Sequence, residues 1–411
     1  MPRSEAVRQA NGLGSGYSFG NDFYQIWFSS GELLRAKRDP YTPEMTRDIQ
    51  VGLYGRPLDL RRPGDPVDQR AFPYPAYTDL LFLPLSKISF PAARIAVLLV
   101  LIALTCTSVV LWIRSLDCHP DWQWTAFALL LTLCSYPALE AFFAGQIGLL
   151  VVFLLAASIV ALQRKRFLLA GVLLALCTIK PQMVALGGVY LLFWVFNDWK
   201  RRSLFVAGFS ATMLLLFGSS LLILPNWIQS WIHTVLAYRH YTQPPLVTEV
   251  LTSPLGPRLA GLASALLTFA SVVLATMLGW RHRRADLNSF EFWLTMSLML
   301  SITAITILPG QAVYDHLILI PAILLLVRER NRFSIAGPPS QILFAIGALV
   351  LFWPWISAFF LIALHPLLAP AVFESTPVFS LPIRTAASLP FAVFALLAWI
   401  WRLNSKTQAA S

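Results

Sequence analysis

The residues of this chain that could do chemistry are few, and most of them interrupt apolar sequence. Lys180 and Pro181 stand together in CTIKPQM, residues 177–183, between the apolar runs FLLAGVLLAL and VALGGVYLLFWVF. A lysine in apolar surroundings is costly unless its charge is paired or reaches water. A proline breaks a helix because it has no backbone N–H to donate. The pair therefore predicts a helix break that presents a cation to a polar cavity.

Further polar side chains occur where apolar runs begin or end. They are Asp22, Glu140, Gln146, Gln182 and the tripeptide Tyr314-Asp315-His316. Ionisable residues inside a membrane are functional candidates by default. We therefore expect these side chains to converge around the helix break.

Each of these residues also has a plainer interpretation. Asp22 could cap a helix, Asp315 could complement a helix N-terminus, and His316 could be an interfacial histidine with a satisfied ring. Lys180 could extend its ammonium toward water while Pro181 only kinks the helix. The sequence leaves these alternatives open.

The composition indicates an all-α polytopic membrane protein. Of the 411 residues, 57% are hydrophobic and only 12% are charged, with a mean hydropathy of +0.66. About a quarter of the residues in an average soluble domain are charged. The net charge is +11, but much of it lies in short loops between apolar runs. That pattern is a topology signal and argues against a nucleic-acid partner.

Apolar runs long enough to cross a membrane, or nearly so, predict about ten or eleven helices. The run 167–196 is too long for one span, so we expect two short helices, 167–180 and 184–196, broken at Lys180-Pro181. The other runs are 92–113, 122–140, 147–162, 204–223, 258–280, 289–308, 312–327, 341–364 and 386–403.

The basic loops orient these helices. The loops are QRKR (163–166), NDWKRR (197–202), RHRR (281–284), RERNR (328–332) and RLNSK (402–406). Positive loops face the cytoplasm, and alternating passes then place all five on that side. The break at Lys180-Pro181 must in consequence face the opposite, non-cytoplasmic side.

Four segments follow from this threading. Residues 1–20 form a polar N-terminal tail without the apolar stretch of a signal peptide, and 21–91 form a long non-cytoplasmic segment. Residues 92–403 form the transmembrane bundle, and 404–411 form a cytoplasmic tail. Within 21–91, apolar residues at helical spacing predict an amphipathic helix lying on the membrane surface. They are Phe23, Ile26, Trp27, Leu33 and Leu34.

Two classes of function fit a broken helix with polar residues beside it. One is a transporter or flippase with its site at discontinuous helices. The other is an enzyme that acts on a lipid-linked substrate at the outer leaflet. The enzyme is favoured because the break is single, no inverted repeat is apparent, and segment 21–91 is rich in Tyr, Pro and Arg.

Several motifs, in order, resemble those of glycosyltransferase family 87. The likeness runs from about Asn21 to about Leu326. Ala76 stands where the family has a second Pro, and Gly148 stands where Asn is common. The motifs are NDFYQIWFSSGELLRAKRDPY (21–41), FPYPAYTDLLFLPL (72–85), GQIGLLVVFLL (145–155), LLAGVLLALCTIKPQM (168–183) and YDHLILIPAILLL (314–326).

The resemblance implies a GT-C-like fold and a reaction. Family members move a hexose, typically mannose, from a polyprenyl-phosphate sugar to an acceptor, here a glycolipid or glycan. The transfer occurs with inversion on the non-cytoplasmic side of the inner (plasma) membrane. The family has a transmembrane helix ahead of its acidic base. Residues 1–20 are polar here, so either that helix is missing from this chain or Asp22 lies on an untethered N-terminus.

The resemblance and the polar residues together suggest roles. Asp22 is the expected general base, with Asp315 next and His316 as a possible donor. Lys180, Gln182 and Tyr314 are expected at the donor phosphate, and Tyr24, Glu140, Gln146 and Tyr241 at the acceptor cavity. Trp227 and Trp231 fit either that cavity or an interfacial belt.

Two expectations about charges and cofactors complete the sequence interpretation. The sequence does not choose among Arg35, Arg56, Arg61, Arg62 and Arg70 as phosphate ligands. The four cysteines lack the spacing of a zinc or redox motif, and no other metal-ligand cluster appears. We therefore expect no metal and no cofactor beyond the lipid-linked donor.

Overall fold

The structure is a computed structural model, and the part of the chain that it describes is built from helices. The described residues are 7–12, 19–62, 64–118, 121–242, 247–309, 312–367, 385 and 388–410. No strand occurs among them. The predicted all-α class is confirmed.

Four helices among the described residues are long and apolar enough to cross a membrane. A fifth span results if α6 and α7, which are bent by 55° at their junction, are counted as one. The four are α5 (Phe90–Ser115), α11 (Trp199–Ile223), α14 (Pro257–Arg281) and α18 (Pro338–Leu364), and the bent pair is α6 (Trp122–Leu133) with α7 (Tyr136–Ala144).

The other apolar runs also form helices, but shorter or interrupted ones. The apolar stretch of each helix is 17 residues or shorter, which is below the length of a typical full span, so the expected ten or eleven membrane helices are not fixed by length and composition. These elements are α8 (Gly148–Gln163), α9 (Phe167–Leu176), η3 (Cys177–Ile179), α10 (Pro181–Phe196), α15 (Phe290–Thr306), η5 (Val313–Leu319), α16 (Ile320–Arg328) and α22 (Leu389–Ala410).

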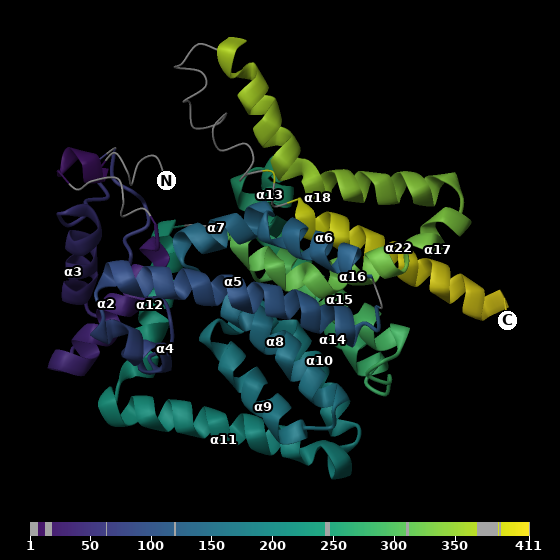
Figure 1. Cartoon of the computed structure of the whole chain (residues 1–411), viewed down its shortest axis with the longest axis horizontal. Helices are drawn as coiled ribbons and strands as arrows, with labels where there is room; N and C mark the ends of the chain where they lie inside the picture. Colours follow the sequence, from purple (N-terminus) through teal and green to yellow (C-terminus); the bar gives the residue numbers. More distant parts are fainter. Residues whose placement is uncertain are drawn as a thin grey trace.

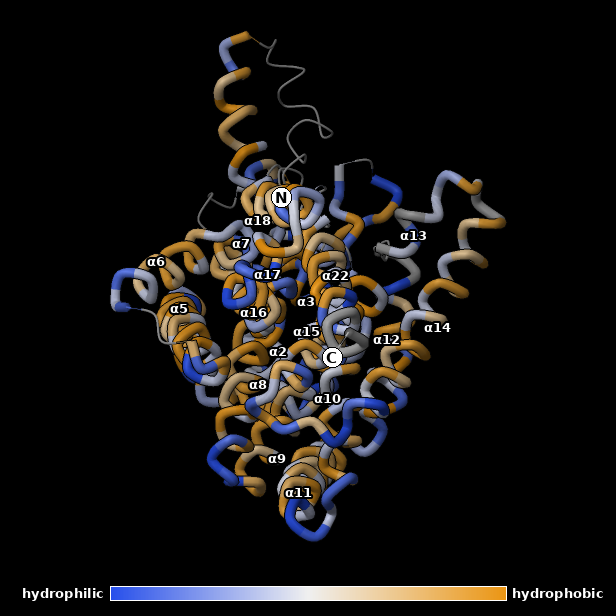
Figure 2. Tube along the Cα trace, turned by 90° about the vertical axis from the view of Figure 1, so that its right-hand side faces the viewer, coloured by the Kyte–Doolittle hydropathy of each residue, from blue (hydrophilic) through white to orange (hydrophobic). Residues whose placement is uncertain are grey.

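The bundle is organised around α15. Every residue of α15 from Phe292 to Thr306 is buried, and the helix packs on α10, α14, α16 and α22. In Figure 1, α5, α8 and α10 lie across the centre and α9 with α11 forms the lower edge. Figure 2 shows apolar colour along the helices and polar colour at connections such as the one beside α11.

Short helices join and flank these elements. They are α12 (Trp227–Thr242), α13 (Val247–Thr252), η4 (Ser253–Leu255), α17 (Arg330–Ile335) and η6 (His365–Leu367). Trp227 is buried against the rings of Phe217 and Tyr77. Trp231 donates its indole N–H to the carbonyl of Pro73 at 3.0 Å. Both tryptophans thus anchor α12 to the N-terminal segment.

Segment 21–91 is folded against the bundle. It contains α2 (Asn21–Ala36), α3 (Pro43–Tyr54), α4 (Tyr77–Phe82) and η2 (Leu83–Lys87), which gather with α12 at one end of the molecule (Figure 1). The amphipathic helix is α2. Its apolar residues Phe23, Ile26 and Leu33 are buried, and α2 packs on α3, α4, η2 and α5. These three residues therefore cover protein, whereas Leu34 of the same helix is 48% exposed.

A buried carboxyl group ties α2 to α4. The Asp79 side chain is fully buried and accepts hydrogen bonds from the hydroxyls of Ser29 at 2.7 Å and Ser30 at 3.1 Å. Burial raises the pKa of Asp79 to about 8, although both serine bonds act to lower it. The neutral acid is therefore the form that burial favours.

Two glycines let α9 and α11 cross at close range. A Cβ atom on Gly171 would lie 1.9 Å from the carbonyl oxygen of Phe205, and one on Gly208 would lie 2.2 Å from that of Leu168. Both obstacles are backbone atoms, which cannot move aside without separating the helices. Small residues at such crossings allow membrane helices to pack closely.

We predict that Gly208→Ala destabilises the protein by about 2 kcal/mol or more, since overpacking typically costs 1–3 kcal/mol. The measurement is thermal unfolding in detergent. Gly218→Ala on the same helix is the matched control, because nothing lies within 4 Å of a Cβ at that position. Equal unfolding temperatures for the two variants would contradict the close crossing.

We also predict a pH dependence that originates at Asp79. Its folded pKa of about 8 lies above the ordinary value of 3.8, so between those pH values the folded chain holds a proton that the unfolded chain has lost. Stability should fall as the pH rises through this window, by up to about 1.4 kcal/mol per pH unit, and stay level above it.

The measurement is the unfolding temperature of wild type and Asp79→Asn from pH 4 to pH 9. The asparagine cannot ionise, so the unfolding temperature of the variant should rise steadily relative to that of wild type up to about pH 8. A difference in unfolding temperature between the two proteins that stays constant over this pH range would show that Asp79 is already ionised in the folded state.

Candidate functional site

The predicted helix break is present at Lys180 and Pro181. Helix α9 gives way to the 3-10 turn η3, Lys180 leaves helical geometry with φ −135° and ψ 73°, and Pro181 begins α10. Because proline cannot donate a hydrogen bond, carbonyls in the preceding turn need other partners. The Tyr77 hydroxyl of α4 donates to the carbonyl of Thr178 at 2.8 Å. Segment 21–91 thus supports the break.

Lys180 is buried, and two hydrogen-bond acceptors and an aromatic ring lie around its ammonium. It is only 5% exposed, and its ammonium donates to Oδ1 of Asp315 and to Oε1 of Gln146, each at 2.9 Å. The ammonium also lies 4.9 Å from the centre of the Tyr314 ring. A buried ion pair is stable when further hydrogen bonds satisfy both ions. Lys180 therefore does not simply reach for water.

Gln146 connects this ion pair to Asp22. Its side-chain amide donates to Oδ2 of Asp22. The contact depends on a close approach of two turns, in which Gly20 donates its N–H to the carbonyl of Phe143 at 2.8 Å. A Cβ on Gly145, whose φ is +71°, would lie 3.4 Å from the Gly20 Cα.

Asp22 does not cap its helix. The N-cap of α2 is Gly20, with φ +83°, and it makes no side-chain cap bond. Asp22 lies in the first turn, and its other oxygen, Oδ1, accepts from the Arg70 guanidinium at 2.6 Å. Both carboxylate oxygens of Asp22 are therefore engaged.

Arg70 is held in place on three sides. Besides Asp22, its guanidinium lies 3.3 Å from the Asp68 carboxylate and donates to the Tyr54 hydroxyl at 3.0 Å. Its backbone has φ +59°, in the left-handed region. Few residues other than glycine adopt this conformation. Local contacts must therefore stabilise the loop that ends at Arg70.

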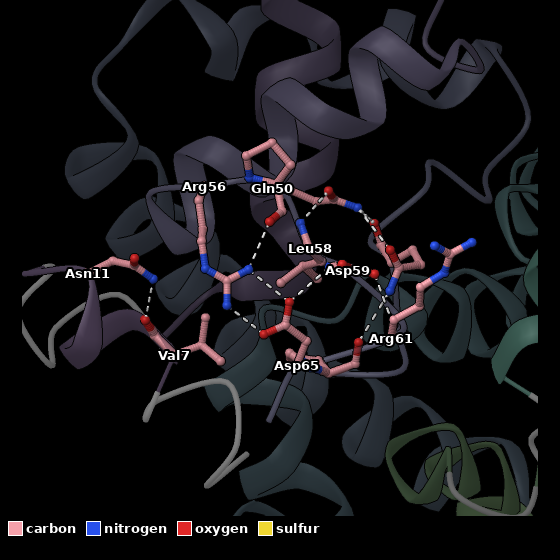
Figure 3. A network of polar contacts seen from close by, with 11 residues as sticks. Val7, Asn11, Gln50, Arg56, Leu58, Asp59, Arg61 and Asp65 are labelled. Carbon is pink, nitrogen blue, oxygen red and sulfur yellow. Dashed lines mark hydrogen bonds and ion pairs between the residues drawn. The ribbon is translucent and has the colours of Figure 1, made fainter. Parts of the chain in front are cut away.

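The network in Figure 3 stabilises that loop. Arg56 grips Asp65 with two hydrogen bonds, of 2.8 Å and 2.5 Å, and the backbone N–H of Asp59 donates to the same carboxylate at 2.8 Å. The hydrogen bonds from Arg56 hold the pKa of Asp65 below its ordinary value. Gln50 of α3 bridges the loop by accepting from the backbone of Leu58 at 2.9 Å.

The result is a continuous line of polar groups, which we call the polar relay. Its members in order are Arg70, Asp22, Gln146, Lys180 and Asp315. Tyr74 and Tyr314 lie close enough to interact electrostatically with Asp22 and Asp315, and both also interact with the Tyr238 phenol. The relay joins segment 21–91 to three separate parts of the bundle.

Several predicted site residues lie beside the relay or away from it. Glu140 of α7 is half-buried, and its Oε2 has no hydrogen bond among the described residues. Gln182 lies two positions from Lys180, but its side chain makes no hydrogen bond to any of the described residues. Tyr24 packs its ring 4.8 Å from that of Phe90. The side chain of Tyr241 lies outside the described residues.

Asp315 and His316 are adjacent in the sequence, but their side chains lie in different surroundings. Both side chains are buried, and they belong to the 3-10 helix η5, where a regular α-helix was expected. Asp315 joins the relay, whereas both ring nitrogens of His316 have no hydrogen-bond partner among the described residues. Asp315 therefore does more than complement a helix terminus, and His316 is not a histidine with a satisfied ring.

Sequence reasoning missed parts of the site. It proposed no role for Tyr54, Tyr74 or Tyr238, and it left five arginines equal. The structure brings Arg70 to Asp22. The signal available for Tyr74 was its position in FPYPAYTDLLFLPL. Tyr238 could have been found as the tyrosine one helical turn before Tyr241.

Comparison with known proteins identifies one family. The family model for glycosyltransferase family 87 matches residues 72–309, which is more than half of the chain. The matched range includes Gln146 and Lys180, while Asp22 and Asp315 lie outside it. No curated protein and no solved structure matches the chain.

We predict that Lys180 and Asp315 stabilise the fold as a pair. Lys180→Met should cost about 3–5 kcal/mol, because it leaves a buried carboxylate without its partner. Adding Asp315→Asn to Lys180→Met should recover much of that loss. Thermal unfolding of both single variants and the double variant measures the coupling. Strictly additive losses would show that the two charges do not depend on each other.

Proposed function

The chain belongs to glycosyltransferase family 87 and is therefore a membrane glycosyltransferase; we propose that it transfers a hexose, mannose by family resemblance, from a polyprenyl-phosphate sugar. The acceptor is a glycolipid or glycan on the non-cytoplasmic face of the inner membrane. Transfer proceeds with inversion and uses no nucleotide sugar.

The observation that carries this proposal is the position of Asp22 between two cations. Its oxygens are bound by Arg70 directly and by Gln146, which in turn binds Lys180. A transferase needs a base for the acceptor hydroxyl and positive charge for the departing phosphate. The polar relay supplies both kinds of group within one connected set.

The proposed step is a single in-line displacement. The acceptor oxygen attacks the anomeric carbon while its proton passes to the Asp22 carboxylate. The bond between that carbon and the phosphate oxygen breaks, and the polyprenyl phosphate leaves with the bonding electrons. One bond forms and one breaks at the carbon, which inverts its configuration.

The new negative charge on the phosphate needs a cation. Of the five arginines that the sequence left open, Arg70 contacts Asp22 and is anchored by Asp68 and Tyr54. The planar guanidinium of arginine forms paired hydrogen bonds with a phosphate in the same way as with a carboxylate. A donor phosphate can therefore replace Asp22 as the partner of Arg70, which frees Oδ1 to accept the proton.

We predict that Asp22→Asn abolishes transfer, with at least a hundredfold loss of rate, because asparagine cannot accept the proton. The assay uses purified protein in lipid, a radiolabelled polyprenyl-phosphate mannose and a crude extract of acceptor lipids. Asp48→Asn is the matched control, because Asp48 lies in the same segment and pairs with Arg38 at the protein surface.

The outcomes separate the competing functions. Label that appears in a new glycan or glycolipid supports a transferase, whereas label that crosses a vesicle membrane on intact donor supports a flippase. A folded Asp22→Asn variant that transfers at the wild-type rate would place the base elsewhere. The unfolding temperature of each variant serves as the test of folding.

A further inference from the structure

A large apolar cavity lies between the bundle and the helices α6 and α18. Its volume is about 850 Å³, and its walls come from α5, α6, η5, α16, α18 and α22. Along α18 the lining runs from Phe344 to Trp355, which corresponds to about 16 Å at the helical rise of 1.5 Å per residue. One leaflet contributes about 15 Å to the hydrocarbon core of a bilayer. The cavity therefore has the depth of one lipid leaflet.

The cavity can be reached from the bilayer between α6 and α18. Both helices contribute lining residues, yet α6 packs on α5 and α7 while α18 packs on α17 and α22. No residue of α6 is buried, as expected of a helix whose outer side faces lipid. An acyl chain in the bilayer can therefore enter the cavity from the side.

The charged residues of the lining gather at one end of the cavity. They are Asp117, which follows α5, and Arg328 and Arg330, at the junction of α16 and α17. The Arg328 guanidinium donates to the carbonyl of Leu116 at 2.7 Å, which brings the two connections together. We call this end the basic mouth. The helix α16 separates it from η5 and therefore from the polar relay.

The surroundings of the basic mouth are those of a membrane interface. The helix α6 begins beside it with Trp122 and Trp124, which are 77% and 61% exposed, and tryptophan is enriched at the level of lipid head groups. Gln163 of the basic loop QRKR donates to the carbonyl of Ser115 at 2.8 Å. Two loops that the charge pattern predicts to be cytoplasmic, 163–166 and 328–332, therefore lie on this face. The cytoplasmic leaflet is the expected source of a lipid here.

The charges at the basic mouth leave a positive excess. Arg328 and Arg332 share the carboxylate of Glu329, at 3.0 Å and 2.5 Å. Arg330 is exposed, and among the described residues its guanidinium donates to a backbone carbonyl alone, at 3.4 Å. Three arginines thus face the carboxylates of Glu329 and Asp117, and one positive charge remains. A phosphodiester carries a single negative charge, whereas a phosphomonoester carries about 1.5 to 2 at pH 7. The excess therefore matches a phosphodiester.

We propose that this cavity binds an anionic phosphodiester lipid of the cytoplasmic leaflet, with the lipid phosphate at Arg330 and one acyl chain along α18. Arginines at the membrane surface attract anionic head groups, and the apolar lining adds affinity in proportion to the chain area that it buries. The inference goes beyond the proposed function and does not depend on it, because the donor phosphate of that reaction binds at Arg70, across the bilayer.

The test is lipid binding by the full-length protein in detergent, measured by native mass spectrometry with phosphatidylglycerol as the probe. Phosphatidylcholine with the same acyl chains should bind wild type at least threefold more weakly, because its head group has no net charge. Arg330→Gln should weaken phosphatidylglycerol binding at least threefold and leave phosphatidylcholine binding unchanged. Arg283→Gln is the matched control, because Arg283 also donates to a carbonyl three positions earlier, that of Trp280, and lies outside the lining. It should bind like wild type.

The chain site is tested with variants that fill the cavity. Ala348 lines it, so Ala348→Phe should weaken phosphatidylglycerol binding at least tenfold. Ala345 of the same helix is exposed and outside the lining, so Ala345→Phe should bind like wild type. If Ala348→Phe does not fold, Ala128→Phe from α6 replaces it, with exposed Ala126→Phe as its control.

Three results would overturn the assignment. Equal affinity for phosphatidylcholine and phosphatidylglycerol would show lipid binding without recognition of the head group. Unchanged phosphatidylglycerol binding in Ala348→Phe and Ala128→Phe would place the lipid outside the cavity. Decaprenyl phosphate that displaces phosphatidylglycerol at equal concentration would assign the cavity to a polyprenyl lipid. None of these measurements uses a sugar or an acceptor, so each result leaves the proposed transfer reaction as it stands.

Discussion

The arrangement of the site depends on one constraint, which is the charge of Lys180 at a helix break in apolar surroundings. A lysine residue that is only 5% exposed needs an anion and a second acceptor for its ammonium. Asp315 and Gln146 meet that need at 2.9 Å each. Because these partners come from different elements, satisfying one side chain fixes the position of η5 and of the α7–α8 turn.

The N-terminal segment meets the same relay from the other side. Arg70 reaches Asp22 from a loop with left-handed backbone, and the grip of Arg56 on Asp65 holds that loop. The Tyr77 hydroxyl binds the carbonyl freed near the break. Asp22 and the helix break are therefore positioned by contacts between segment 21–91 and the bundle. Neither part holds the complete set of groups.

The sequence predicted the broken helix correctly because its signal is local. A charged residue followed by proline in an apolar run has few structural solutions. The polar residues at the ends of apolar runs were also recognisable, and Asp22, Gln146 and Asp315 lie in the relay with Lys180. Their chemical roles stay predictions until activity is measured.

Other features depend on tertiary contacts that a sequence pattern does not encode. The five arginines of segment 21–91 look alike, and only the folded loop directs Arg70 to Asp22. Gln182 follows Lys180 by two positions, and residues two apart on a helix do not share a face. The number of membrane spans could not be predicted from the sequence either. The same apolar residues can be buried in a 3-10 turn or in an α-helix, and the apolar pattern does not distinguish the two.

The 3-10 geometry of η5 makes this segment sensitive to its length. With three residues per turn, successive side chains are about 120° apart, so the side chains of Asp315 and His316 point in different directions within the protein. Deleting a single residue between Ala312 and Asp315 would rotate the carboxylate away from Lys180. An added residue would do the same in the other direction. Natural insertions and deletions in relatives should therefore avoid η5 and collect in the connections between helices.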